Sequence, residues 1–154
     1  MLTATPGLIG ESGVPLSAAK EGFMAQFGNI ERENKILIVD DDKSVRDFLE
    51  LFLRKKGYTQ VRTAESGLDA LKIVEQENIK LVLLDIMLPG MDGMEVLRKI
   101  KAMKKETGVI MITGFPDEEK AKAMIKEGAY DYIVKPFDLT YLELSVLTKI
   151  LLMV

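Results

Sequence analysis

Short apolar runs and amphipathic stretches alternate along the chain from residue 35 onward. Four runs are rich in Ile, Val or Leu, are too short for helices, and cover residues 36–39, 81–84, 109–112 and 132–134. Continuous apolar runs of this length are typical of parallel strands that are buried on both faces. The segment TQVRT at 59–63 alternates polar and apolar residues instead. This alternation predicts an edge strand with one side more open.

Between these runs, apolar residues recur at the three-to-four-residue spacing of a helix face. The first four faces are marked by Val45, Phe48, Leu49 and Phe52; by Leu68, Leu71 and Val74; by Leu97, Ile100 and Met103; and by Ala121, Met124 and Ile125. A fifth helix is expected from about Leu139 to the end. Gly57 and Gly128 follow the first and fourth faces, and we expect them to end those helices in a left-handed conformation.

Five strands that each precede a helix, with short connections, predict an α/β fold. It is a (βα)₅ doubly wound parallel five-stranded sheet with right-handed crossovers. The strand order 2-1-3-4-5 fits best, because it puts the alternating second strand at an edge. In such a sheet, ligands bind beyond the carboxyl ends of the strands where the order reverses, between strands 1 and 3.

The first 34 residues differ in character from the rest of the chain. They hold five of the 12 glycines and two of the five prolines, so residues 1–15 are expected to form a flexible lead-in. Helical spacing over 16–30 predicts a short helix, which either docks on the domain or forms a partner or dimer face. We therefore divide the chain into an N-terminal extension, 1–34, and one domain, 35–154.

Composition removes several classes of function. The chain of 154 residues carries a net charge of −3, so its bulk charge does not indicate nucleic-acid binding. It contains no Cys and no His, which excludes disulfides, thiolate-bound zinc, His-based catalysis and a phosphohistidine on this chain. No apolar run reaches the ~18 residues of a membrane span, and the N-terminus lacks a signal-peptide pattern. A cytoplasmic protein is therefore expected.

Carboxylates follow the two strands at the predicted reversal of strand order. The first strand runs into Asp40, Asp41 and Asp42, and the third ends at Asp85. If strands 1 and 3 are neighbours, Asp40, Asp41 and Asp85 crowd one small cleft, and such a group needs positive charge. A hard divalent cation with oxygen ligands, Mg²⁺, is the natural occupant. Asp42 is assigned to the N-cap of the first helix.

The fourth and fifth strands bring Thr113 and Lys135 to the same edge. Mg²⁺ and a lysine can neutralise the oxygens of a transferring phosphoryl group, and a threonine hydroxyl can donate to one of them. An aspartate can accept the group as a mixed anhydride. Asp85, alone on the middle strand, is placed to do so, which leaves Asp40 and Asp41 to hold the metal.

In combination, these motifs resemble the receiver domain of two-component response regulators. The resemblance runs from residue 35 to the C-terminus and rests on VDD at 39–41, DIMLPGMDG at 85–93, Thr113 and KPF at 135–137. It implies a flavodoxin-like receiver fold and a phospho-accepting signalling domain rather than an enzyme. It also implies that Asp85 is the phospho-acceptor. The implied Mg²⁺ ligands are Asp40, mainly through water, Asp41, Asp85 and the backbone carbonyl of Met87.

The resemblance also implies a switch. Thr113 would bind a phosphoryl oxygen and Lys135 would pair with it, while Tyr132 matches the switch aromatic of the family. Phosphorylation adds negative charge that can draw Thr113 inward. Tyr132 could then fill the vacated space and shift the surface of the fourth helix, fifth strand and fifth helix. Pro136 is expected in the cis form.

The partners implied are a sensor histidine kinase or phosphotransfer protein as donor, and a downstream protein target. The fifth helix is apolar beyond one stripe, which leaves open a homodimer through the helix 4, strand 5 and helix 5 surface. The direct interpretation is a stand-alone regulator. A fragment of a longer regulator with an effector domain, and a receiver-like scaffold that is not phosphorylated, stay open as alternatives.

Two other uses of the same residue types fit less well. A phosphohydrolase of the haloacid-dehalogenase type needs a second aspartate two residues after the nucleophile, and that position is Met87. A nucleotide binder would need a Ser-, Thr- or Gly-rich loop after the first strand, where three aspartates would repel a phosphate. Met87 and Phe115 are bulky and apolar at positions that modulate phosphoryl lifetime in the receiver family, so slow self-dephosphorylation is expected.

Overall fold

The structure is a computed structural model that describes Ala18 and residues 33–152. Apart from Ala18, the predicted lead-in and the predicted helix over 16–30 lie outside the described residues, as do residues 153–154. The division of the chain after residue 34 therefore stays a prediction. Within the described ranges, no helix combines the length and the hydropathy that a membrane span requires.

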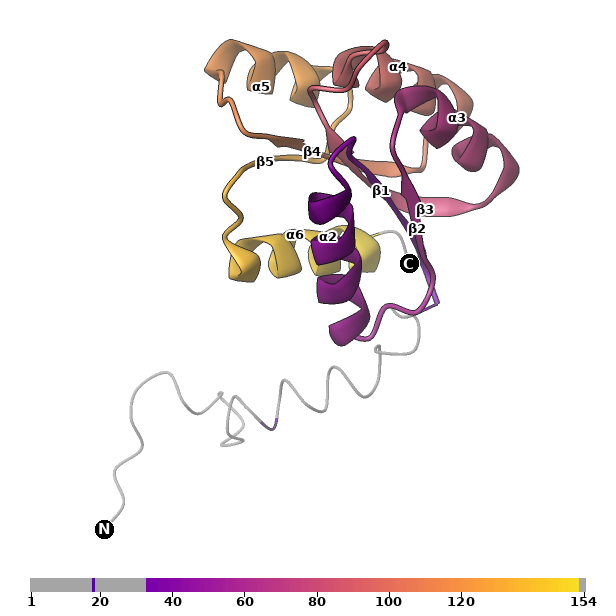
Figure 1. The fold of residues 1–154 in the computed structure, drawn as a ribbon, viewed down its shortest axis with the longest axis vertical. Coiled ribbons are helices and arrows are strands. Elements are labelled where there is room, and N and C mark those ends of the chain that lie inside the picture. Colours follow the sequence, from indigo (N-terminus) through magenta and orange to yellow (C-terminus); the bar gives the residue numbers. More distant parts are fainter. Residues whose placement is uncertain (1–17, 19–32, 153–154) are drawn as a thin grey trace.

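Five parallel strands alternate with five helices in the described part of the chain (Figure 1). The strands are β1 (Lys35–Val39), β2 (Val61–Ala64), β3 (Ile79–Asp85), β4 (Gly108–Thr113) and β5 (Asp131–Val134). The helices are α2 (Lys43–Lys55), α3 (Gly67–Gln76), α4 (Gly93–Met103), α5 (Glu118–Lys126) and α6 (Leu139–Leu152). The sheet order is β2-β1-β3-β4-β5. The predicted fold and strand order are confirmed, and α2 to α6 are the five predicted helices.

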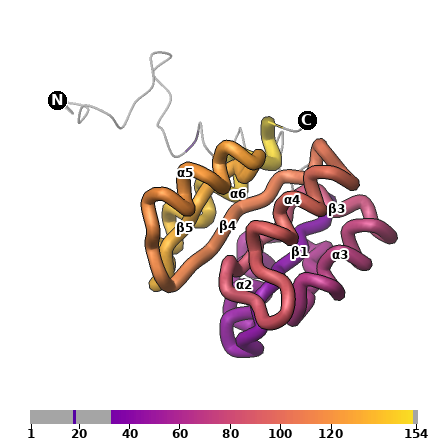
Figure 2. The backbone as a smooth tube through the Cα atoms, turned by 90° about the horizontal axis from the view of Figure 1, so that it is seen from above, coloured from indigo at the N-terminus to yellow at the C-terminus, as the bar shows by residue number. Residues whose placement is uncertain are grey.

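Helices cover both faces of the sheet, as Figures 1 and 2 show. On one face, α2 and α6 bury Leu49, Leu53, Leu142, Val146 and Ile150 against Ile36 and Ile38. On the other face, α3, α4 and α5 pack on Leu37 and Val39. Successive side chains of a strand point to opposite faces. Two covered faces therefore explain why β1 is apolar at every position from Ile36 to Val39.

The edge strand β2 is shifted from the predicted range of 59–63. It begins at Val61 and ends at Ala64, and these residues pair in register with β1 from Ile36 to Val39. The carbonyl of Gln60 already accepts the N–H of Ile36 at 2.9 Å, although Gln60 lies just before the strand. The predicted edge position is confirmed.

Helix ends and loops beside the sheet follow local rules. The Asp42 carboxylate accepts the N–H of Ser44 at 2.8 Å and caps α2 as predicted. Gly57 and Gly128 have φ values of 100° and 106°, and the peptide bond before Pro136 is cis. Gly93 at the start of α4 is constrained by close approach, because a Cβ there would lie 2.6 Å from the Cα of Ile86.

Candidate functional site

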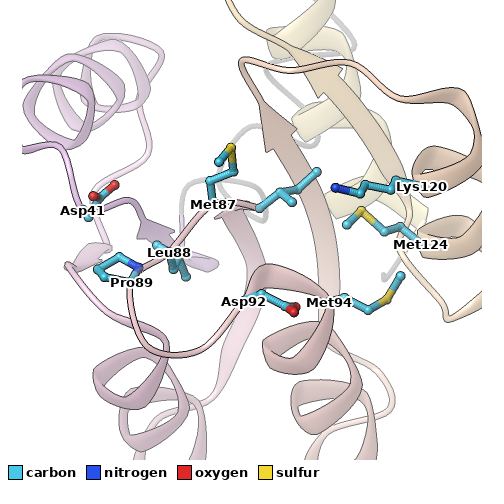
Figure 3. Close-up of a pocket in the computed structure, with 9 residues that line it drawn as sticks. Asp41, Met87, Leu88, Pro89, Asp92, Met94, Lys120 and Met124 are labelled. Atoms are coloured by element: carbon cyan, nitrogen blue, oxygen red, sulfur yellow. The ribbon is translucent and has the colours of Figure 1, made fainter.

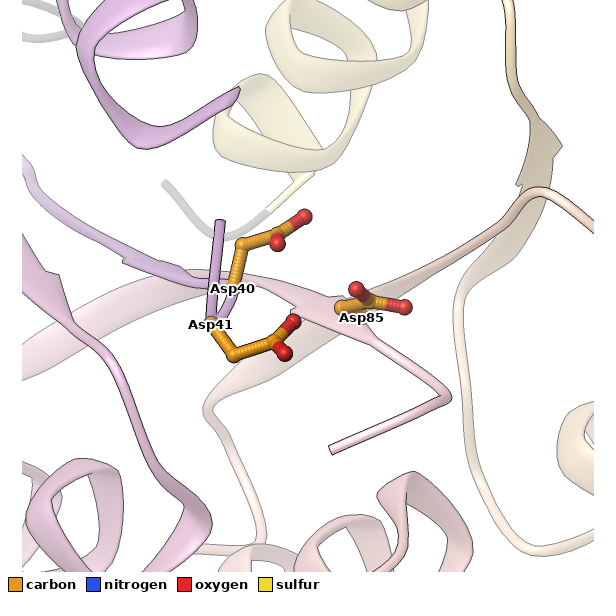
Figure 4. A group of neighbouring side chains, drawn as sticks. All are labelled: Asp40, Asp41 and Asp85. Atoms are coloured by element: carbon orange, nitrogen blue, oxygen red, sulfur yellow. The ribbon is translucent and has the colours of Figure 1, made fainter. Parts of the chain in front are cut away.

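Three aspartates meet at the carboxyl ends of the neighbouring strands β1 and β3 (Figure 4). Asp40 follows β1 and Asp85 is the last residue of β3, and these two strands pair directly. One carboxylate oxygen from each of Asp40, Asp41 and Asp85 lies within 4.8 Å of the other two. Asp40 and Asp85 are buried, whereas Asp41 is exposed. The structure therefore brings together the three carboxylates that the sequence placed at this edge.

Lys135 and two backbone amides contact this acidic cluster. Asp40 accepts the N–H of Asp42 at 2.9 Å, and Asp85 accepts the N–H of Met87 at 3.1 Å. The Lys135 ammonium donates to the second oxygen of Asp40 at 2.9 Å and of Asp85 at 3.4 Å. Each buried carboxylate therefore has one amide donor and a share of the same ammonium group.

Burial and charge act in opposite directions on the acidic cluster. Burial raises the pKa of the Asp85 carboxyl, and the Asp40 charge adds to this, although the Met87 amide and Lys135 oppose it. Burial alone would lower the pKa of the Lys135 ammonium, but its hydrogen bonds and charge interactions with Asp40 and Asp85 raise the net value. Lys135 is thus charged at neutral pH. One ammonium cannot balance three carboxylates.

The donor set fits a hard divalent cation. All the side-chain ligands are carboxylate oxygens, which Mg²⁺ prefers to nitrogen or sulfur. With Lys135 counted, ionised Asp40, Asp41 and Asp85 leave a formal charge of −2 at the cluster, which a divalent ion would balance. Asp41 is the most accessible of the three, so it can bind an ion at the least cost in desolvation. A role for the Met87 carbonyl stays a prediction.

The predicted switch residues are bonded to the β4–α5 loop rather than to the acidic cluster. Thr113 ends β4 and is buried, and its hydroxyl donates to the Phe115 carbonyl at 3.2 Å and accepts the Phe115 N–H at 3.0 Å. The Tyr132 hydroxyl accepts the N–H of Asp117 at 3.2 Å, and Asp117 is the N-cap of α5. Both side chains are therefore connected to the segment that leads into α5.

A cavity of about 650 Å³ opens beside the acidic cluster. Figure 3 shows Asp41, Met87 and Pro89 along one side, with Lys120 and Met124 of α5 across from them. Its walls are mainly apolar and it reaches the exposed carboxylate of Asp41. This cavity offers a route from solvent to the predicted metal site.

Two contacts around the site could not be predicted from the sequence. The Arg46 guanidinium donates to the backbone carbonyl of Asp40 at 2.7 Å, but the sequence contains no signal that separates Arg46 from other charged residues of α2. Phe48 of α2 stacks on Phe137 with ring centroids 6.2 Å apart. Phe137 belongs to the KPF motif, which gave no indication of its partner.

Comparisons with known proteins all point to one family. Residues 36–147 match the family model of the response regulator receiver domain. A CheY-like receiver domain protein from Methanospirillum hungatei JF-1 is 33% identical with a TM-score of 0.74, over 78% of this chain and 95% of that one. The receiver domain of NtrX from Brucella abortus is 37% identical with a TM-score of 0.71, over 75% and 98%. A longer NtrX chain from the same organism, 36% identical with a TM-score of 0.72, is matched over 77% of this chain and 27% of that one.

Proposed function

This chain belongs to the response regulator receiver domains of two-component signalling, and from that premise we propose that Asp85 accepts a phosphoryl group. The donor is a histidine kinase or a phosphohistidine protein. The reaction depends on Mg²⁺ held by Asp40, Asp41, Asp85 and the Met87 carbonyl. The observation that carries the proposal is the convergence of three carboxylates and Lys135 at the ends of β1 and β3.

The transfer is a displacement at phosphorus. A carboxylate oxygen of Asp85 forms a bond to phosphorus while the bond from phosphorus to the donor imidazole nitrogen breaks. The nitrogen keeps the electron pair of that bond, and the product is an acyl phosphate on Asp85. Mg²⁺, when bound, supplies charge that offsets the phosphoryl oxygens.

Lys135 and Thr113 assist this step from the chain itself. Lys135 already donates to Asp85, so a small movement lets its ammonium pair with a phosphoryl oxygen instead. Thr113 binds another phosphoryl oxygen after its hydroxyl leaves Phe115. The receiver thus provides orientation and charge, while its partner provides the phosphoryl group.

The signal passes to the surface of α5, β5 and α6. When Thr113 turns toward the phosphoryl group, Tyr132 releases the Asp117 amide and moves into the space that Thr113 leaves. Because Asp117 caps α5, that release alters the start of the helix on the output surface. A downstream protein, or a second copy of this chain, then binds the altered surface.

The test is the intact mass of the protein after incubation with Mg²⁺ and acetyl phosphate. The wild type is expected to gain one phosphoryl group, and neither Asp85→Asn nor the wild type in EDTA should gain it. Asp92→Asn is the matched control, because Asp92 lies in the loop that follows Asp85, lines the cavity and caps α4. It should be labelled as fully as the wild type. Labelling of Asp85→Asn would disprove the acceptor assignment, and an unlabelled wild type that also fails to bind beryllium fluoride would favour the scaffold alternative.

A further inference from the structure

Arg46 reaches back from the first turn of α2 to the backbone that carries the proposed metal ligands. Its Nη1 donates to the carbonyl oxygen of Asp40 at 2.7 Å. The side chain of Arg46 is only 14% exposed, and its Nη2 lies 3.9 Å from a carboxylate of Glu65 that is 71% exposed. The sheltered contact with Asp40 is therefore the stronger of the two, since exposed ion pairs contribute little.

The loop that Arg46 contacts is short and carries two proposed ligands in succession. It consists of residues 40–42, between the end of β1 and the start of α2. The amides of its first and last residues are both hydrogen-bonded. The Asp40 N–H donates to the Ala64 carbonyl, and the Asp42 N–H donates to the Asp40 carboxylate. The bond from Arg46 holds the carbonyl of the peptide group between Asp40 and Asp41. The orientation of this peptide group sets the direction in which the Asp41 side chain leaves the backbone.

The contact with Arg46 uses no carboxylate oxygen of the acidic cluster. Lys135 bonds directly to the oxygens of Asp40 and Asp85, so it must share them with an incoming cation. Arg46 bonds only to a backbone carbonyl there, so it leaves the carboxylate oxygens free for a cation. The two cations therefore have different effects on metal binding.

We propose that Arg46 is a positioning residue for the metal site. It holds the peptide group of Asp40 and Asp41 so that both carboxylates face Asp85 before the cation arrives. The inference rests on the proposed function, because that function assigns Mg²⁺ to these carboxylates. Residues that orient metal ligands typically change metal affinity roughly 10–100-fold when they are removed.

The experiment measures the dissociation constant of Mg²⁺ by isothermal titration calorimetry on the full chain. Arg46→Met keeps the apolar part of the side chain but removes the donor and the charge, and its dissociation constant should rise about tenfold. Arg46→Lys should recover part of this loss, because its ammonium can still donate to the Asp40 carbonyl. Lys43→Ala is the matched control, since Lys43 lies in the same turn, is 77% exposed and bonds to Asp47. It should bind Mg²⁺ as the wild type does.

Thermal unfolding in EDTA separates positioning from general stability. Leu51→Gly destabilises the same helix and is the control for stability. A positioning role predicts a loss of Mg²⁺ affinity in Arg46→Met that Leu51→Gly does not share. Leu51 is an exposed residue of α2, away from the acidic cluster. Should Arg46→Met fail to fold, Arg46→Lys takes over the test, with affinity several-fold below that of the wild type expected.

Three outcomes would overturn the inference. They are wild-type affinity in Arg46→Met, wild-type affinity in Arg46→Lys when Arg46→Met is unfolded, and an equal loss in Lys43→Ala. Labelling by acetyl phosphate distinguishes these outcomes from failure of the proposed function. A labelled wild type with unaltered Mg²⁺ affinity in Arg46→Met disproves only the positioning role. A wild type that binds Mg²⁺ in an Arg46-dependent way but is never labelled disproves only the phospho-acceptor role.

Discussion

The Lys135 ammonium lies 2.9 Å from a carboxylate oxygen of Asp40, a residue 95 positions earlier in the chain. Its distance to Asp85 is longer, at 3.4 Å. Before any cation binds, Lys135 is therefore chiefly the counterion of Asp40. The Asp85 carboxylate is held less closely, which suits its proposed role as the group that forms a new bond to phosphorus.

Asp85→Asn is expected to stabilise the protein in EDTA. Asparagine removes a buried charge that lies within 4.8 Å of two other carboxylates, and it can still accept the Met87 N–H. Like charges at this distance repel by about 3 kcal/mol at an effective dielectric constant of 20, and Lys135 offsets part of this. We therefore expect the free energy of unfolding to rise by about 1–2 kcal/mol. Urea denaturation in EDTA at pH 7 measures the change.

Mg²⁺ should reduce that advantage, because it binds the folded wild type more tightly than the variant. Asp92→Asn, which changes an exposed N-cap aspartate, is the control. Its free energy of unfolding should match that of the wild type both in EDTA and in Mg²⁺. A variant that is less stable than the wild type in EDTA would contradict the charge argument.

Tyr132→Phe is expected to favour the phosphorylated conformation. The Tyr132 hydroxyl accepts the N–H of Asp117 at 3.2 Å, and in the proposed switch this bond must break. Removing it lowers the cost of switching by about 0.5–1 kcal/mol, the net value of a partly exposed hydrogen bond. The affinity for beryllium fluoride should therefore rise about two- to fivefold. Fluorine NMR of the bound ligand measures this affinity.

Tyr141→Phe is the matched control for that variant. Its hydroxyl bonds to the Asp131 carboxylate at 2.8 Å, on the same proposed output surface but away from the start of α5. Its affinity for beryllium fluoride should equal that of the wild type. An equal rise in both variants would mean that the tyrosine hydroxyls affect the surface in general and not through Asp117.

Glu77→Gln is expected to weaken the dependence of stability on acid pH. The hydrogen bond from Lys35 lowers the pKa of the Glu77 carboxyl, burial opposes this, and the charges of Arg62 and Lys35 add to the lowering. A carboxyl whose folded-state pKa lies below its unfolded value stabilises the protein above the unfolded value, here near 4.5. That stability is lost as the pH falls through the lower folded-state pKa.

The variant should be less stable than the wild type near neutral pH, by about 0.5 kcal/mol for a pair of this exposure. The difference should vanish once Glu77 of the wild type is protonated. Urea denaturation from pH 3 to 7 follows both changes. Glu75→Gln removes an exposed carboxylate from α3, the helix that Glu77 caps at its C-terminal end, and serves as the control. A constant difference between Glu77→Gln and the wild type across this range would refute the linkage.

Phosphorylated wild-type protein is expected to lose its label slowly in Mg²⁺. Met87 and Phe115 are 58% and 73% exposed, and neither carries an acid or amide that could orient an attacking water. Phe115→Glu supplies such a group and should speed the loss roughly tenfold, below the ~100-fold of an aligned catalytic base. Intact mass against time gives both rates. Phe115→Leu controls for the loss of the ring. If it loses the label as fast as Phe115→Glu, the bulk of Phe115 alone protects the phosphoryl group.

Much of the fold follows from patterns that are local in the chain. The run at 36–39 reads as a strand buried on both faces because its alternate side chains meet helices on opposite sides of the sheet. Asp42, Gly57 and Gly128 act within one turn of their own helices, so their roles were also predictable. Given strands 1 and 3 as neighbours, Asp40, Asp41 and Asp85 had to meet, because parallel strands end at the same edge of a sheet.

The partners of long side chains depended on distances in space that no local pattern contains. Arg46 bonds to the Asp40 carbonyl rather than pointing into solvent, because side chains of a helix point toward its N-terminus and this one reaches the loop before α2. Thr113 lay on the expected strand, yet its hydroxyl bonds to Phe115 and not to the acidic cluster. The Tyr132 hydroxyl likewise accepts the N–H of Asp117, fifteen residues away in the chain. Strand periodicity and order place a residue at an edge, but the hydrogen bonds it forms there depend on its rotamer and on which polar atoms the packed helices leave within reach.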